Sequence, residues 1–99
     1  NGQPAVATFI PSPPTSASGG STVDLTMLVT DAIGATVASE APRVTVLEGS
    51  GDFVSATSID TNYAGYWRIR LRIGSVSGQV NRFRVEMGSV VREVSIRTR

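Results

Sequence analysis

Large apolar side chains and arginines alternate strictly along residues 66–73, and this pattern constrains the fold more than any other feature of the chain. The apolar positions are Trp67, Ile69, Leu71 and Ile73, and the charged positions are Arg68, Arg70 and Arg72. Successive side chains of a β-strand point to opposite faces, whereas a helix would scatter both sets around its circumference. We therefore predict a strand with one face in a hydrophobic core and an arginine-bearing face in solvent.

The same two-residue period recurs in several short segments separated by glycine-containing turns. We predict about seven strands, near residues 5–10, 22–30, 36–47, 53–59, 66–73, 79–87 and 90–97. No segment has helical periodicity, and the spacing leaves no room for the crossover helices that a parallel sheet needs. The predicted fold is therefore all-β, an immunoglobulin-like sandwich of two antiparallel sheets.

The alternation also predicts which side chains fill the space between the two sheets. The expected core is Val23, Leu25, Met27, Val29, Val44, Val46, Trp67, Ile69, Leu71, Ile73, Phe83, Val85, Met87, Val94 and Ile96. The chain of 99 residues is long enough for one such core, so we expect residues 1–99 to form a single domain.

Residues 11–22 are rich in proline, serine and glycine, which exclude a helix or a central strand. Two interpretations remain open for this segment: an interdomain linker, or a loop between a first edge strand and the body of the domain. We favour the loop.

Cysteine, histidine and lysine are absent, and all nine basic residues are arginine. The usual general bases and activated nucleophiles are therefore missing, and serine has no partner to activate it. A pair of carboxylates remains chemically possible, but a sandwich of this size offers no deep cleft for a sugar ring. We predict that the domain is not an enzyme.

The formal net charge of +1 and the isoelectric point of about 8.6 are too balanced for a nucleic-acid-binding domain. No apolar segment approaches the roughly 18 residues of a membrane-spanning helix, so we expect no direct membrane insertion. Asp60, Asn62 and Gly65 are spaced like the start of a calcium loop, but Ala64 replaces one oxygen ligand. Gly49-Ser50-Gly51 lacks the rest of a phosphate loop. We expect neither a metal nor a cofactor.

Two groups of residues are candidates for ligand binding. Arg68, Arg70 and Arg72 form a row that suits sulfate, phosphate or carboxylate groups. We expect instead that the row lies beside the strand carrying Asp24, that Arg82 and Arg84 lie next to Glu93 on the opposite sheet, and that these charges form weak cross-strand pairs.

Tyr63 and Tyr66 are the other candidates, because exposed aromatic rings stack on sugars. Trp67 has the parity of the core residues, so we assign it to the core. That leaves two tyrosines, which make a small platform for a sugar.

The turns of the chain share a recognisable spacing. Residues 29–37 have the form V-x-D-x-x-G-x-x-V, Gly49-Ser50-Gly51 follows the next strand, and residues 60–66 are similar to a T-D-x-x-G turn. Together these turns resemble those of bacterial immunoglobulin-like domains of group 1, the invasin and intimin type. Gly78 precedes the last core strands, as in that family, whereas Thr36 stands where the family has proline. The resemblance covers roughly residues 22–97.

The resemblance implies a spacer or adhesion module of a larger bacterial protein, located outside the cell or at its surface. Its expected partners are neighbouring domains of the same chain and a cell-surface protein or glycan. The alternatives are a module that binds a polyanion or carbohydrate, and an accessory domain of an extracellular enzyme.

Overall fold

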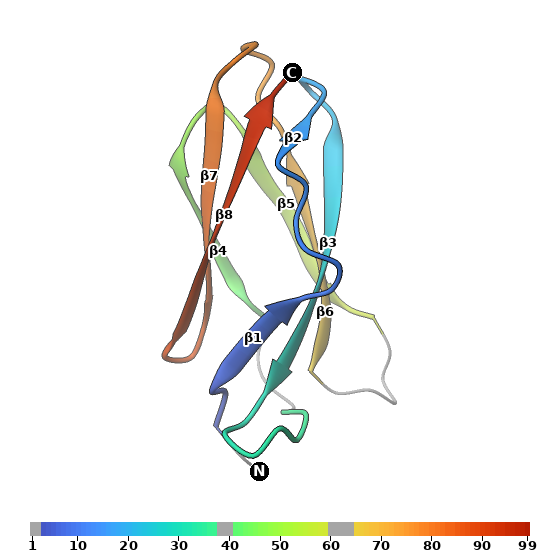
Figure 1. Cartoon of the computed structure of the whole chain (residues 1–99), viewed down its shortest axis with the longest axis vertical. Helices are drawn as coiled ribbons and strands as arrows, with labels where there is room; N and C mark the ends of the chain where they lie inside the picture. Colours follow the sequence, from blue (N-terminus) through green and yellow to red (C-terminus); the bar gives the residue numbers. More distant parts are fainter. Residues whose placement is uncertain (1–2, 38–40, 60–64) are drawn as a thin grey trace.

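A computed structural model of the chain describes residues 3–37, 41–59 and 65–99. The chain forms an elongated sandwich with principal extents of 43 × 23 × 19 Å (Figure 1). The eight strands are β1 Val6–Phe9, β2 Ser16–Ala17, β3 Thr22–Thr30, β4 Arg43–Glu48, β5 Asp52–Ser58, β6 Tyr66–Arg72, β7 Val80–Met87 and β8 Val90–Thr98. The predicted all-β sandwich is confirmed.

The strands divide into two four-stranded sheets, sheet A with the order β1-β3-β6-β5 and sheet B with the order β2-β8-β7-β4. The connection from β6 to β7 therefore crosses between the sheets, as expected for an immunoglobulin-like topology. This crossing keeps the arginines of β6 away from those of β7. Neighbouring long strands pair in antiparallel fashion within each sheet.

The expectation of purely antiparallel pairing is wrong at one place. Within the predicted loop of residues 11–22, β2 forms a short parallel pair with β8, in which Ser16 lies opposite Arg97 and Ala17 opposite Thr98. Because a parallel pair needs a long connection, it joins segments that are far apart in the sequence. A two-residue strand has no period to detect, so the alternation gives no sign of it.

The strand predicted over residues 36–47 is also shorter than expected. Thr36 makes only an isolated bridge to Thr30, residues 38–40 lie outside the described part, and β4 begins at Arg43, directly after Pro42. A register shift between Val46 and Glu48 then interrupts its pairing with β7, which resumes with Glu48 opposite Arg82.

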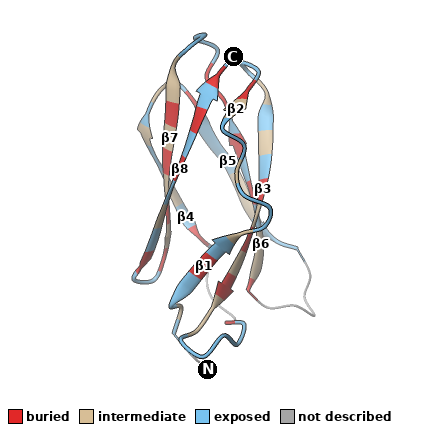
Figure 2. Ribbon diagram, in the orientation of Figure 1, coloured by how far each residue is buried: buried red, intermediate tan, exposed pale blue. Residues whose placement is uncertain are grey.

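Inward-facing side chains of both sheets form one core, seen as alternating buried positions along the strands in Figure 2. Most of the predicted core residues are buried, while Val23, Val44 and Trp67 are half-buried and pack against the others. Val46 is the exception, because β4 is an edge strand and leaves this side chain 37% exposed. Within the described residues, the hydrophobic core also includes four side chains that the alternation missed: Ala7, Ala17, Val37 and Val90.

Two polar residues are buried with this core near the C-terminal end of β8. The Asn81 Nδ2 donates hydrogen bonds to the Ile96 carbonyl and to Thr98 Oγ1, both at 2.9 Å. The Gly74 N–H donates to Asn81 Oδ1, and the Thr98 hydroxyl donates to the Gly74 carbonyl. The network joins the crossing segment after β6 to the last strand.

Candidate functional site

The three arginines of β6 lie in the middle of the outer face of sheet A, where β3 and β5 flank them. Thr26 and Thr57 are the register partners of Arg68. The partners of Arg70 are Asp24 and Ser55, and those of Arg72 are Thr22 and Asp52. The row thus lies among hydroxyl groups, with acidic residues beside two of its three members.

The Asp24 carboxylate holds the middle arginine in a two-bond ion pair. Arg70 Nε lies 2.8 Å from Asp24 Oδ1, and Arg70 Nη2 lies 3.2 Å from Oδ2. The hydrogen bond from Arg70 lowers the pKa of Asp24, and the positive charge of Arg68 contributes to the same shift. The predicted pairing of this row with the strand of Asp24 is confirmed, and it leaves Arg70 engaged within the domain.

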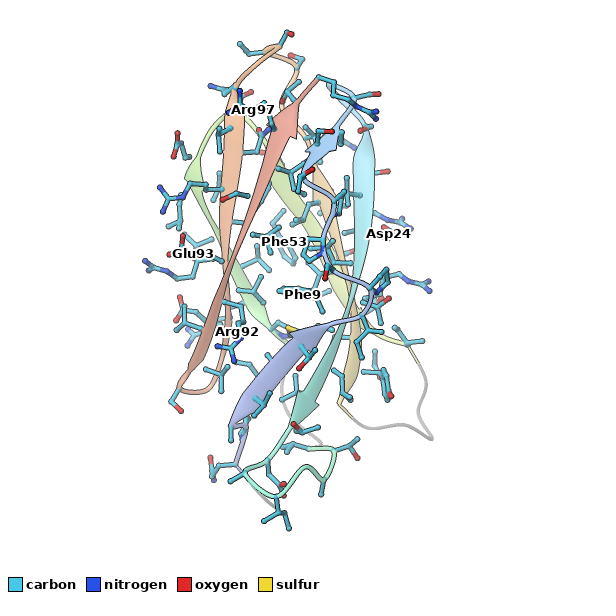
Figure 3. All side chains as sticks on the ribbon, viewed as in Figure 1. Phe9, Asp24, Phe53, Arg92, Glu93 and Arg97 are labelled. Atoms are coloured by element: carbon cyan, nitrogen blue, oxygen red, sulfur yellow. The ribbon has the colours of Figure 1, made fainter. Side chains whose placement is uncertain are left out.

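Sheet B has a similar arrangement on its own outer face. Arg82 lies between two acids, with Nη1 3.2 Å from Glu48 Oε1 and Nη2 2.9 Å from Glu93 Oε1. These hydrogen bonds raise the pKa of Arg82. Glu93 and Asp24 project outward from opposite sides of the molecule in Figure 3. The predicted proximity of Arg82 to Glu93 is therefore confirmed, and Arg84 lies opposite Glu93 in the register.

The aromatic candidates do not form a described platform for a sugar. Tyr66 is half-buried on the outer face of sheet A, and Tyr63 lies outside the described residues. Trp67 packs against the core, as predicted. Its indole Nε1 is buried and has no hydrogen-bond acceptor within the described part of the chain.

A shallow hollow of about 330 Å³ lies at the end of the sandwich where β3 finishes. It is lined by Gln3, Pro4, Ala5, Asp31, Ala32 and Ile33. Asp31 Oδ1 accepts hydrogen bonds from the N–H groups of Ile33 and Ala35, so the carboxylate holds its own turn. The Ile33 side chain is 90% exposed. The sequence predicts this turn from Gly34, but it contains no signal that the hollow would form beside it.

The described residues contain no group of three or more acidic, histidine or cysteine side chains placed to hold a metal ion. The calcium-like segment from Asp60 to Ala64 lies outside the described residues, and Gly49-Ser50-Gly51 lies at the connection between β4 and β5. Over residues 3–37, 41–59 and 65–99, the chain forms no helix that is long and apolar enough to cross a membrane.

Comparison with known proteins identifies a fold and no family. No family model matches the chain, and no curated protein matches its sequence. Among solved structures, the chain is similar to the ZirS C-terminal domain, with a TM-score of 0.74 and 21% sequence identity over 100% of this chain and 70% of that chain. At this level of identity the similarity concerns the fold alone. The resemblance of the turns to group 1 bacterial immunoglobulin-like domains therefore stays a prediction.

Proposed function

We propose that this domain is a non-catalytic spacer or adhesion module of a larger secreted or cell-surface bacterial protein. The observation that carries the proposal is the position of its two ends. The described chain begins and finishes at opposite ends of the 43 Å long axis (Figure 1). Such a domain holds whatever precedes it and whatever follows it apart.

Contacts at each end keep the entering and leaving segments close to the sandwich. Pro4 lies next to the turn at Gly88 that joins β7 to β8. At the other end, Arg99 N–H donates to the Ala17 carbonyl at 2.9 Å, and Gly78 N–H donates to the Thr98 carbonyl at 2.8 Å. Because both segments are tied to strands of the core, the separation of the ends follows from the fold itself.

The outer faces support a spacer better than a polyanion-binding surface. Arg70 and Arg82, the middle cations of the two sheets, are both paired with carboxylates of neighbouring strands. Exposed pairs of this kind contribute little to stability, but the carboxylates reduce the positive electrostatic potential that would attract an anionic ligand. The bacterial and extracellular part of the proposal rests on the turn motifs, and its expected partners are adjacent domains and a cell-surface protein or glycan.

Distance measurement between spin labels tests the spacer role. The chain has no cysteine, so Gln3→Cys and Arg99→Cys place one label at each end without further changes. We expect one narrow distribution of label-to-label distances, centred near the length of the long axis. A broad distribution, or a centre at half that length, would contradict a rigid spacer.

One observation favours a second candidate function, the binding of an anionic glycan. Arg68 has threonines, and no carboxylate, as its register partners on both sides. The test is retention of the domain on immobilised heparin at two salt concentrations, with Arg68→Gln as the variant and Arg97→Gln as the control. No retention at low salt removes this candidate, and equal loss in both variants indicates non-specific attraction.

A further inference from the structure

The two sheets have four edges, and three of them are protected against pairing with another chain. β1 is short, and Arg92 Nε donates to the Ala7 carbonyl on its free side at 3.0 Å. β2 has only two residues. β4 follows Pro42 and has the charged residues Arg43 and Glu48 at its two ends. Short length, capping, proline and charge are the usual protections of an edge strand.

The fourth edge, β5, lacks these protections over most of its length. From Phe53 to Ile59 the sequence has no charged residue, proline or glycine, which is the composition of a segment that pairs readily. Phe53, Val54 and Ile59 are 39%, 43% and 40% exposed. The register shift between Phe53 and Ser55 disturbs the beginning of the strand and leaves the part from Ser55 to Ser58 in regular pairing with β6.

Hydrogen bonding to β6 determines which backbone groups of β5 remain free. Ile59 N–H donates to the Tyr66 carbonyl at 3.2 Å. Hydrogen-bonded and non-hydrogen-bonded pairs alternate along an antiparallel ladder, so Thr57 is hydrogen-bonded to Arg68 while Ala56 and Ser58 are not bonded to β6. The N–H and C=O groups of Ala56 and Ser58 therefore point to the open side of the sheet.

We propose that β5 pairs with β5 of a second copy of this chain, in antiparallel orientation about a two-fold axis at Thr57. In this register Ala56 of each copy lies opposite Ser58 of the other, and the two residues exchange hydrogen bonds on both sides of the axis. Thr57 then faces its own equivalent in a non-hydrogen-bonded pair. All four backbone groups that Ala56 and Ser58 leave open are satisfied.

The side chains fit this register as well as the backbone. Residues directly opposite must lie on the same face of a sheet, and Ala56 and Ser58 share one face by strand parity, whereas Thr57 lies on the other face, beside Arg68. The two Arg68 side chains would be three strand spacings apart, about 14 Å, which exceeds the screening length of physiological salt. No like charges meet at the axis, and opposed threonines form a favourable cross-strand pair.

A second copy fits this edge better than an unrelated extended peptide does. The strand has no charge that would select a peptide, and an isologous contact needs no sequence beyond the one present. The paired segment is short, so we expect a weak dimer whose fraction rises with protein concentration. The contact leaves both ends of the long axis free and is independent of the spacer role.

Disulfide capture tests the register directly, because any cysteine introduced into this chain is the only one. A non-hydrogen-bonded antiparallel pair has the short Cα separation that a disulfide needs. We expect Thr57→Cys to form a covalent dimer at least about tenfold faster than Thr45→Cys under mild oxidation. Thr45 is the matched control, since it is an exposed threonine at the centre of the other full-length edge, β4. Equal rates for the two variants would overturn the proposal.

Sedimentation of cysteine-free protein over a concentration series gives the second readout. Ser58→Pro removes an N–H that the dimer uses and that β6 does not, so we expect the dimer to disappear while the melting temperature stays nearly constant. If this variant fails to fold, Thr57→Lys provides the same readout by placing two like charges at the axis. A monomer at every concentration, a dimer unaffected by either variant, or growth beyond the dimer would each contradict the proposed pairing.

Discussion

Asn81 and Thr98 show how single polar side chains are accommodated among the apolar residues between the sheets. Both are almost fully buried, at 0% and 1% exposure, and every hydrogen-bonding group of the Asn81 amide has a partner. A buried polar group costs free energy mainly when its partner is missing. The network is therefore tolerated because it is complete, and it fixes the position of Gly74 against β8.

Asn81→Leu keeps the branching of this side chain at Cγ, adds volume, and removes its hydrogen bonds. The Gly74 N–H, the Ile96 carbonyl and the Thr98 hydroxyl each lose a buried partner, so we expect the free energy of unfolding to fall by about 2–4 kcal/mol. Urea denaturation measures the difference, with Ser95→Ala on the exposed face of β8 as the control. A loss no larger than that of the control would show that the network does not stabilise the fold.

The ion pair of Asp24 and Arg70 predicts a pH dependence whose sign follows from the lowered pKa of Asp24. A depressed pKa in the folded state stabilises the protein while the carboxylate is ionised, and this contribution is lost as the pH falls through that pKa. Asp24→Asn should therefore melt at a slightly lower temperature than the parent at pH 7. The two melting curves should converge in acid. A difference that persists unchanged at low pH would assign the effect to something other than the carboxylate charge.

The sequence predicts well which surface charges lie together. Their positions follow from the parity of each strand and from which strands are neighbours in the sheet. Once β6 is placed beside β3, Asp24 is expected near the arginine row, and the structure confirms it. The buried Asn81 network is different, because it depends on the path of the crossing segment around Gly74. Alternation along β7 contains no information about that path.

At the scale of the strands, the alternation predicts burial well for a strand that is paired on both sides. It predicts burial poorly for a strand at the edge of a sheet. β3, β6 and β7 lie within a sheet, so their period follows burial closely and their bounds agree with the prediction. Val46 of the edge strand β4 has the parity of a core residue and remains exposed. β2 was not predicted because its position depends on its distant partner β8.

Gly65 directly precedes β6 and lies against the end of β3, where the Val29 N–H donates to its carbonyl. A glycine is needed at this junction for two separate reasons. Gly65 has a φ of +92°, and a Cβ there would lie 2.6 Å from the Val29 carbonyl oxygen and 3.3 Å from the Val37 nitrogen. Gly34 has nearly the same φ, +91°, but a Cβ there would have no atom within 4 Å. The two positions thus share the strain of a positive φ and differ in the space around them.

Alanine substitution at these two glycines separates the two effects. Gly34→Ala should cost about 1–2 kcal/mol from the positive φ alone. Gly65→Ala should cost about 2 kcal/mol more, because the backbone of β3 must move away from the added methyl group. Chemical denaturation of the two variants gives both values, and equal losses would show that the junction adapts without strain.

For the whole molecule, the arrangement of the first and last strands determines how the sandwich resists tension between its ends. β2 pairs in parallel with β8 and β1 in antiparallel fashion with β3, and the long strands β3 and β8 extend along the long axis (Figure 1). A force applied through the two ends acts along these strands, so their hydrogen bonds are loaded together. A force applied across the strands would instead load the hydrogen bonds one after another.

Single-molecule pulling in two geometries measures this difference. Attachment through Gln3→Cys and Arg99→Cys loads the long axis, whereas Gln3→Cys and Ser89→Cys places both handles at one end, because Pro4 lies beside the turn at Gly88. We expect the first geometry to require the higher unfolding force. The same force in both would show that the terminal strands do not carry the load.

The parallel pair of β2 and β8 joins residues 16–17 to residues 97–98, which are far apart along the chain. A ribosome synthesises the N-terminal member of this pair early and the C-terminal member late. Sheet B therefore cannot acquire its outer strand until Thr98 has left the exit tunnel. In a longer protein made of such units, each unit would complete its folding only after its own synthesis had finished, which separates it in time from the unit that follows.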